Sequence, residues 1–233
     1  MKKSAVFKQI REVYRIISRS ALRAGRNPEE VRLLVVTKTV GLQAIREAVE
    51  SGVRLFGENR VQEAKKKILS DEIRTIPEKL EWHLIGHLQK NKAKDAVQFF
   101  DLIHSVDSIE LAEELDRQAE KIGKTQRVLV QVKLSDEETK SGVAEEGLHH
   151  LLERIMQLKH LQLEGLMTIP PYRENVRDVM PYFRRLRELR DEAEKSGFRL
   201  PELSMGMSHD YEAAIEAGAT MVRIGTAIFG ERC

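Results

Sequence analysis

The stretch ELSMGMSHDYEAAIEAGATMVRI, residues 202–224, decides the fold of this chain. Short apolar runs at 202–205 and 221–224 predict two strands, and the segment between them predicts a helix that begins near Ser208. Strands joined through a helix are typical of a parallel sheet, because the helix carries the chain back to the end where the first strand began. The stretch therefore predicts one unit of an α/β fold.

The same alternation of strand and helix runs through the rest of the chain. Further apolar runs predict strands at 31–36, 53–56, 82–85, 102–106, 128–132 and 163–169. Most of these runs are short, continuous and rich in Val, Ile and Leu, which is typical of parallel strands buried on both faces. Helical spacing lies between them, and Val6, Ile10, Val13 and Ile17 form an apolar stripe before the first strand.

Eight strands and eight helices, the first helix preceding the first strand, favour a TIM-like (β/α)8 barrel of the α/β class. A doubly wound open sheet is the alternative. Residues 225–233 are too few for a full helix after the last strand, so we expect the N-terminal helix to fill that gap in the outer ring. No Gly-rich or Pro-rich linker divides the chain, and we therefore interpret residues 1–233 as a single domain.

Composition excludes several classes of function. Lys plus Arg (39) nearly balances Asp plus Glu (37), so the net charge of +2 gives no case for nucleic-acid binding. No apolar run approaches the ~20 residues that span a bilayer, and the charged N-terminal segment lacks the apolar core of a signal peptide. The only cysteine, Cys233, excludes an intrachain disulfide and a zinc site of the cysteine type. We expect a cytoplasmic protein, without membrane or nucleic-acid partners, and a monomer.

A lysine stands where such a barrel places its active site, at the carboxyl end of a strand. Lys38 follows the buried run of the first predicted strand, where its ammonium must reach water, find a partner or lose its proton. One reading is a lysine that extends to solvent at the barrel mouth. The other is an amine that attacks a carbonyl, as in Schiff-base enzymes.

Small residues follow the last two predicted strands, where barrels often bind phosphate. They would let backbone amides approach an anion closely, and they are Ser204, Gly206, Ser208, Gly225 and Thr226. Glycines after strands are also common for structural reasons. Combined with a reactive lysine at another strand end, this loop pair indicates a phosphorylated aldehyde as the ligand.

Arg223 lies inside the last predicted strand, on the same side as Gly225. An arginine in a barrel interior is unfavourable unless it is paired. Facing a pyridine nitrogen, a guanidinium would donate a hydrogen bond without giving up its proton, which weakens the ring as an electron sink. The alternative is a structural ion pair with Glu58 or another carboxylate at a strand end.

Other polar residues give weaker signals. Asn59 could hydrogen-bond a ligand or cap the next helix. His83 and His87 are spaced i, i+4, but HLIGH lacks the Glu of HExxH, and we therefore predict no metal site. For His104 and His209 the sequence shows no Ser or Cys partner.

The chain resembles the pyridoxal phosphate homeostasis proteins, single-domain relatives of the alanine racemase N-terminal barrel. The resemblance covers nearly the whole length, and its motifs are VVTKT (35–39), FGENRVQEAKKK (56–67), WHLIGHLQKNK (82–92), IHSVDS (103–108), KSG (140–142), GLMTIPP (165–171) and the segment from 202 to 232. Relatives usually carry Ser-Lys followed shortly by Pro, whereas this chain has Thr37-Lys38-Thr39-Val40-Gly41.

The resemblance implies a fold-type III barrel that holds pyridoxal 5'-phosphate (PLP) as a Schiff base. It implies attachment to Lys38, a contact of Arg223 with the pyridine nitrogen, a phosphate held by Ser204, Gly225 and Thr226, and a role in binding for Asn59. It also implies intracellular PLP homeostasis or carriage, with PLP-dependent apoenzymes as recipients and without an established catalytic activity. The alternatives are an amino-acid racemase or another weak PLP-dependent enzyme, and a cofactor-free Schiff-base aldolase.

Overall fold

The computed structural model describes residues 4–135, 137 and 141–230. Cys233 and Lys140 of the KSG motif therefore lie outside the described residues. Within the described ranges, no helix is long and apolar enough to cross a membrane.

Eight parallel strands close into one barrel, which confirms the prediction and rules out the open sheet. Each strand pairs with the next along the chain, and the last returns to pair with the first, with Arg32 opposite Met221. The strands are β1 (Arg32–Val36), β2 (Leu55–Glu58), β3 (Glu81–Leu84), β4 (Leu102–Val106), β5 (Gln126–Gln131), β6 (Leu161–Met167), β7 (Glu202–Met207) and β8 (Met221–Ile224).

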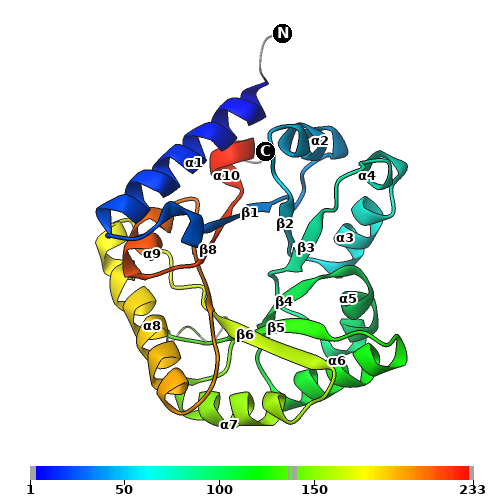
Figure 1. The fold of residues 1–233 in the computed structure, drawn as a ribbon, viewed down its shortest axis with the longest axis vertical. Helices are drawn as coiled ribbons and strands as arrows, with labels where there is room; N and C mark the ends of the chain where they lie inside the picture. Colours follow the sequence, from blue (N-terminus) through cyan, green and yellow to red (C-terminus); the bar gives the residue numbers. More distant parts are fainter. Residues whose placement is uncertain (1–3, 136, 138–140, 231–233) are drawn as a thin grey trace.

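Helices form a ring around the strands (Figure 1). They are α1 (Ala5–Arg23), α2 (Leu42–Glu50), α3 (Val61–Ile68), α4 (Asp71–Arg74), α5 (Ala93–Phe99), α6 (Ile109–Lys121), α7 (Glu145–Met156), α8 (Met180–Lys195), α9 (Tyr211–Ala217) and α10 (Thr226–Phe229). Short 3-10 turns lie at η1 (Pro28–Glu30), η2 (Lys90–Lys92) and η3 (Val176–Val179).

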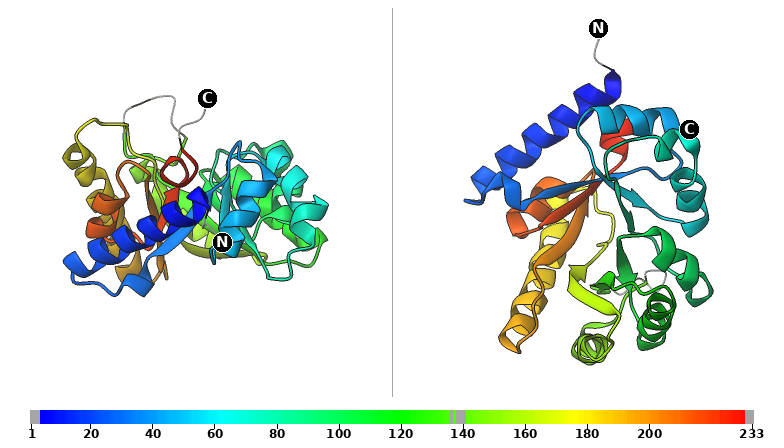
Figure 2. Two further views of the ribbon diagram at one scale, coloured as in Figure 1. Left: turned by 90° about the horizontal axis from the view of Figure 1, so that it is seen from above. Right: turned by 45° about the vertical axis from the view of Figure 1, so that its right-hand side comes forward.

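The N-terminal helix α1 completes this ring. Ser4 caps it by accepting a hydrogen bond from the Phe7 amide, and the predicted stripe buries Ile10, Val13 and Ile17. The helix packs against α9, α10 and α2, so it occupies the gap that the short C-terminal segment leaves (Figures 1 and 2). The chain thus closes its outer layer with its first helix.

Apolar side chains form two cores, one on each side of the sheet. The larger core lies between the strands and the helices. The smaller one lies inside the barrel and consists of Leu34, Ile85, Leu102, Leu129, Met167 and Met221. Polar side chains share the barrel interior with this second core, and they connect to the site described below.

Gly165 marks a close approach between β6 and β7. A Cβ atom at this position would lie 1.9 Å from the carbonyl oxygen of Glu202, its partner in the register. The two strands can therefore pair at this point only if residue 165 has no side chain.

Candidate functional site

A cavity of about 280 Å³ opens at the carboxyl ends of the strands. It is lined by Val36, Lys38, Asn59, Ile85, Ile169, Met207, Ser208, His209, Arg223, Gly225 and Thr226. Five of the six residues that the sequence predicted for the site meet here, from the ends of β1, β2 and β8. The sixth, Ser204, does not line the cavity.

The backbone that carries Lys38 is held from behind by a buried polar cluster. The Thr37 hydroxyl donates to Oε1 of Glu58 at 2.6 Å, and the Lys67 ammonium donates to the same oxygen at 2.7 Å and to the Thr37 carbonyl oxygen at 2.6 Å. Glu58 is fully buried, and its other carboxylate oxygen has no hydrogen-bond partner among the described residues. Burial raises the pKa of Glu58, although the hydrogen bonds from Lys67 and Thr37 act to lower it. The cluster fixes the end of β1.

The residue after Lys38 adopts a strained conformation. Thr39 has φ of +59°, in the left-handed region that a β-branched residue rarely enters. Its amide donates to Oε1 of Glu63 at 2.6 Å, and Glu63 also accepts from Lys67 at 2.7 Å. This chain has Thr37 where relatives usually have Ser before the lysine, and the Thr37 hydroxyl binds Glu58. The turn after Lys38 is therefore anchored despite this difference.

The Lys38 side chain is not anchored in the way that its backbone is. Among the residues that the structure describes, none forms a hydrogen bond or an ion pair with its ammonium group, although the side chain is half-buried and lines the cavity. A half-buried amine without a partner remains available to a ligand.

The loop after β7 shapes the opposite wall of the cavity. Gly206 has φ of +91°, and a Cβ atom there would lie 2.5 Å from Cβ of Ala214, so the turn requires glycine. The Met207 amide donates to the carboxylate of Asp210 at 2.6 Å, and α9 begins only at Tyr211, later than the start near Ser208 that the sequence predicted. Ser208 therefore lies in the loop, and it faces the cavity.

Ser208 meets the amides that follow β8. Its hydroxyl oxygen accepts from the Gly225 amide at 3.2 Å and from the Ala227 amide at 3.3 Å. Two backbone donors thus converge on one oxygen position beside Thr226. This is the geometry that an anion oxygen requires.

Ser204 lies apart from the other predicted site residues. The family resemblance implies a phosphate contact for it, and in the structure the residue is fully buried and does not line the cavity. It contacts Nη1 of Arg223 at 2.7 Å and Nδ1 of His104 at 2.9 Å. The bend at Gly206 separates it from Ser208, so Ser204 lies beneath the cavity, and Ser208 takes the place at the loop.

Arg223 lies at the floor of the cavity and is nearly fully buried. Its Nη1 donates to the carbonyl oxygen of Ser204 at 2.7 Å, in addition to the hydroxyl, and its Nη2 donates to the carbonyl oxygen of Thr168 at 2.8 Å. Burial lowers the pKa of Arg223 to about 10, which leaves the guanidinium charged at neutral pH. The alternative ion pair with Glu58 is absent from the described contacts, since Glu58 pairs with Lys67.

Asn59 and His209 complete the polar lining. Arg60, and not Asn59, is the N-cap residue of α3, and Asn59 lines the cavity. The imidazole of His209 hydrogen-bonds the carbonyl oxygen of Arg173 at 3.1 Å and lies 5.2 Å from the ring of Tyr172. Ser208 is one of the small residues that the sequence predicts near an anion, but neither Ser208 nor His209 is among the six predicted site residues, because only the loop geometry places them at the cavity.

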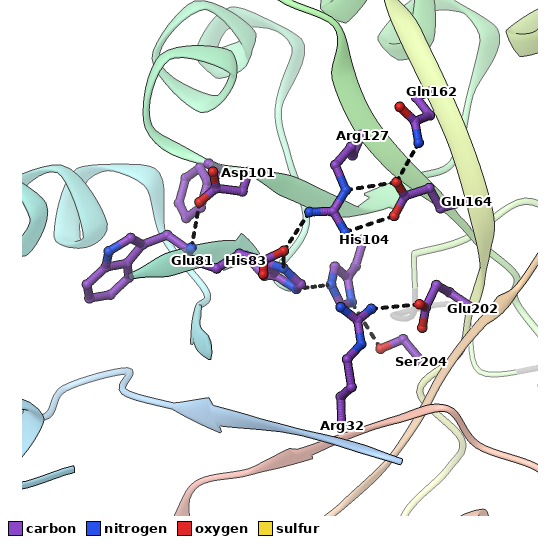
Figure 3. A network of polar contacts seen from close by, with 12 residues as sticks. Arg32, Glu81, His83, Asp101, His104, Arg127, Gln162, Glu164, Glu202 and Ser204 are labelled. Carbon is purple, nitrogen blue, oxygen red and sulfur yellow. Dashed lines mark hydrogen bonds and ion pairs between the residues drawn. The ribbon is translucent and has the colours of Figure 1, made fainter. Parts of the chain in front are cut away.

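Two of the remaining histidines, His83 and His104, contact each other inside the barrel, and His87 lies apart from them. His83 is buried and contacts Glu81 and His104, whereas His87 is half exposed beside Asp107. Figure 3 shows His83, His104 and Ser204 in one line of contacts inside the barrel. Among the described residues, no group of three or more His, Cys, Asp or Glu side chains could hold a metal ion.

Known proteins share this fold and sequence over most of the chain. Residues 9–233 match the family described as alanine racemase, N-terminal domain. The pyridoxal phosphate homeostasis protein of Aquifex aeolicus is 50% identical over 217 residues, which cover 93% of this chain and 93% of that protein. The protein of the same name from Escherichia coli is 44% identical over 220 residues, covering 93% of this chain and 92% of that protein. The structure of PipY from Synechococcus elongatus with PLP bound has a TM-score of 0.82 and 42% identity, covering 92% of this chain and 100% of that chain.

Proposed function

The chain belongs to the pyridoxal phosphate homeostasis protein family, and from this premise we propose that it binds PLP covalently on Lys38 and serves PLP homeostasis. The observation that carries the proposal is the Lys38 amine, which lines the cavity without a hydrogen bond or ion pair to any described residue. An aldehyde in the cavity would meet a free primary amine. The buried cluster around Glu58 and Lys67 would hold the backbone that carries this amine.

The loops fit a phosphate group. The amides of Gly225 and Ala227 already converge on an oxygen atom, that of Ser208, and Thr226 adds a hydroxyl to the same wall. Among the described residues, the cavity lining includes Lys38 and Arg223 but no carboxylate. A phosphate dianion would therefore find backbone donors and a positive potential, with Ser208 in the role that the family resemblance implies for Ser204.

The floor of the cavity fits a pyridine nitrogen. PLP, when bound, supplies an electron-withdrawing ring that stabilises negative charge on an attached carbon. Arg223 would donate a hydrogen bond to that ring and keep its own proton, which restrains such chemistry. This supports a holder of the cofactor rather than an efficient enzyme.

We extend the proposal to the setting of this protein. A monomer that works in the cytoplasm and passes PLP to apoenzymes would suit a site that binds an aldehyde reversibly, since a Schiff base can be hydrolysed or exchanged with another amine. Size-exclusion chromatography with light scattering tests the monomer. Activation of a PLP-dependent apoenzyme by the loaded protein tests the transfer.

Reduction and mass mapping test the attachment. The protein should be mixed with PLP, treated with borohydride and digested, and the pyridoxyl label should lie on the peptide that contains Lys38. A Lys38→Ala variant should lose the label and the visible absorption of bound PLP, whereas a Lys92→Ala control, which alters another lysine on the same end of the barrel, should keep both. A label on a different lysine in the wild type would refute the assignment.

Affinity for the phosphate tests the loops. Pyridoxal without its phosphate should bind at least about tenfold more weakly, because each lost charge-assisted hydrogen bond is worth roughly 1.5–3 kcal/mol. Ser208→Ala should weaken binding of PLP and leave binding of pyridoxal unchanged. Equal affinity of the wild type for both aldehydes would mean that the loops hold no phosphate.

A further inference from the structure

A single line of hydrogen bonds runs through the barrel, from the floor of the cavity to the opposite end. Arg223 contacts Ser204 at 2.7 Å, Ser204 contacts His104 at 2.9 Å, His104 contacts His83 at 2.9 Å, and His83 contacts Glu81 at 2.9 Å. Glu81 is the first residue of β3 and therefore lies at the amino end of the strands. Figure 3 shows the part of this line from Glu81 to Ser204.

The chemistry of the groups fixes the direction of every bond. The Glu81 carboxylate only accepts, so Nε2 of His83 carries the proton and its Nδ1 is an acceptor. The Nε2 of His104 must then donate to His83, which leaves Nδ1 of His104 to accept from the Ser204 hydroxyl. The Ser204 oxygen in turn accepts from the Arg223 guanidinium. All four bonds point the same way, from the cation to the carboxylate.

Both imidazoles are neutral in this arrangement. Burial lowers the pKa of His83 and lowers that of His104 well below its usual value, and the charge of Arg223 acts on His104 in the same direction. The hydrogen bond from His83, together with that from Arg127, lowers the pKa of Glu81 to about 2 although burial opposes this. These directions favour neutral imidazoles and a charged Glu81 at neutral pH.

The amino end of the line is held by further charges. Arg127 contacts Glu81 at 2.5 Å and forms two hydrogen bonds with Glu164, at 2.8 and 3.0 Å (Figure 3). Glu164 also accepts from Gln162, but it has no contact with His83 among the described residues. Two carboxylates thus share one arginine, and only one of them belongs to the line.

We propose that Glu81, His83, His104 and Ser204 form a polarised relay that couples a carboxylate at the amino end of the barrel to Arg223, and that this relay weakens the hydrogen bond from Arg223 to the ring nitrogen of PLP. The proposal rests on the proposed function, since PLP is its target. The four are positioning residues and do not touch the ligand. Hydrogen bonds in a chain polarise one another, so the pull of Glu81 on the line strengthens the bond from Arg223 to Ser204. A guanidinium that donates a stronger hydrogen bond to one acceptor donates a weaker one to a second acceptor.

The relay does not merely place Arg223. The carbonyl oxygens of Ser204 and Thr168 already hold the guanidinium at 2.7 and 2.8 Å, and they would do so if the hydroxyl of Ser204 were removed. Burying His83 and His104 costs free energy of desolvation, which an apolar core of the same volume would avoid. Because the two carbonyl oxygens already position Arg223, we assign to the relay the direction in which it polarises the guanidinium.

The direction can be tested without PLP. Long-range ¹H–¹⁵N NMR of the ligand-free protein at neutral pH should show both His83 and His104 as neutral Nε2–H tautomers. An Nδ1–H tautomer on either ring, or a charged ring at this pH, would overturn the relay. This measurement is independent of the proposed function, so it stands even if PLP were to bind elsewhere.

The coupling to the cavity is tested with ¹⁵N-labelled PLP on the full chain. Glu81→Gln removes the charge and Ser204→Ala removes a link, so both should move the ring-nitrogen signal upfield, the direction of a stronger hydrogen bond. We expect a change of about two- to fivefold in the dissociation constant of PLP to accompany the shift. Glu164→Gln is the matched control, because it alters the other carboxylate on Arg127, and it should leave the signal in place.

Two results would overturn the coupling between Glu81 and the ring nitrogen. One is a ring-nitrogen signal that is the same in wild type, Glu81→Gln and Ser204→Ala. The other is a shift in Glu164→Gln as large as that in Glu81→Gln. Thermal unfolding of each variant shows whether it is folded, and Ser204→Ala carries the test if Glu81→Gln is not. If the wild type did not bind PLP, the proposed function would be refuted. The relay would not, because the tautomers of His83 and His104 are measured without ligand.

Discussion

Replacing Lys67 with Met should destabilise the barrel strongly, because Lys67 is the cation at the centre of the cluster behind Lys38. Its ammonium makes three hydrogen bonds of 2.6–2.7 Å, to the Thr37 carbonyl oxygen, Glu58 and Glu63. The Lys67 side chain is 10% exposed and that of Glu58 is 0% exposed, so the variant would leave a carboxylate buried without its partner. Breaking such a pair costs about 3–5 kcal/mol of the free energy of unfolding.

The loss should depend on pH. Burial already raises the folded-state pKa of Glu58 above 4.5, and loss of Lys67 raises it further. A group with a raised folded-state pKa binds a proton in the folded protein before the unfolded one, so its contribution to stability grows as the pH falls toward 4.5. The difference between Lys67→Met and wild type should therefore shrink between pH 7 and pH 5, and Glu58→Gln added to the variant should recover part of the loss.

Urea unfolding followed by the fluorescence of Trp82 measures these differences. Trp82 is the only tryptophan of the chain, and it stacks on Phe56 with ring centroids 5.2 Å apart. Lys65→Met is the control, since Lys65 lies on the same helix, is 43% exposed and pairs with Asp95 at 3.3 Å. The control should cost at most about 1 kcal/mol. A Lys67→Met variant no less stable than this control, or a deficit that grows as the pH falls, would refute the reasoning.

Two further outcomes follow from the barrel interior. Gly165→Ala should lower the free energy of unfolding by about 1–3 kcal/mol, because its Cβ would overlap the carbonyl of Glu202. Gly147→Ala on helix α7 is the control and should change the free energy of unfolding little. Similar melting temperatures for the two variants would contradict the close strand approach. Stability should also decline as the pH falls below about 6.5, since His83 and His104 have folded-state pKa values below those of the unfolded chain and are charged more readily when it unfolds. His104→Gln should flatten this slope in urea titrations across pH 5–7, and the exposed His149→Gln should not, so an unchanged slope in His104→Gln would count against the neutral pair.

The sequence alone determined the barrel and the end of it that carries the site. Eight continuous apolar runs separated by helical stripes leave few other parallel architectures, and the position of a residue at the end of its own strand is a local property. Lys38, Arg223, Gly225 and Thr226 could therefore be predicted, because each is fixed by the strand that precedes or contains it. The family motifs added Asn59 and the identity of the ligand.

Only the tertiary structure decided which serine reaches the cavity and what lies beneath it. The bend at Gly206 places Ser208 at the cavity, beside the amides of Gly225 and Ala227, and leaves Ser204 in the barrel interior. Neither strand propensity nor the two-residue alternation of side chains predicts this difference. His104 and Ser204 are 100 positions apart in the chain, and they meet because closure of the barrel brings β4 and β7 to opposite sides of one narrow interior. Periodicity records which face a side chain takes on its own element, whereas contacts across the barrel depend on how all eight strands close around it.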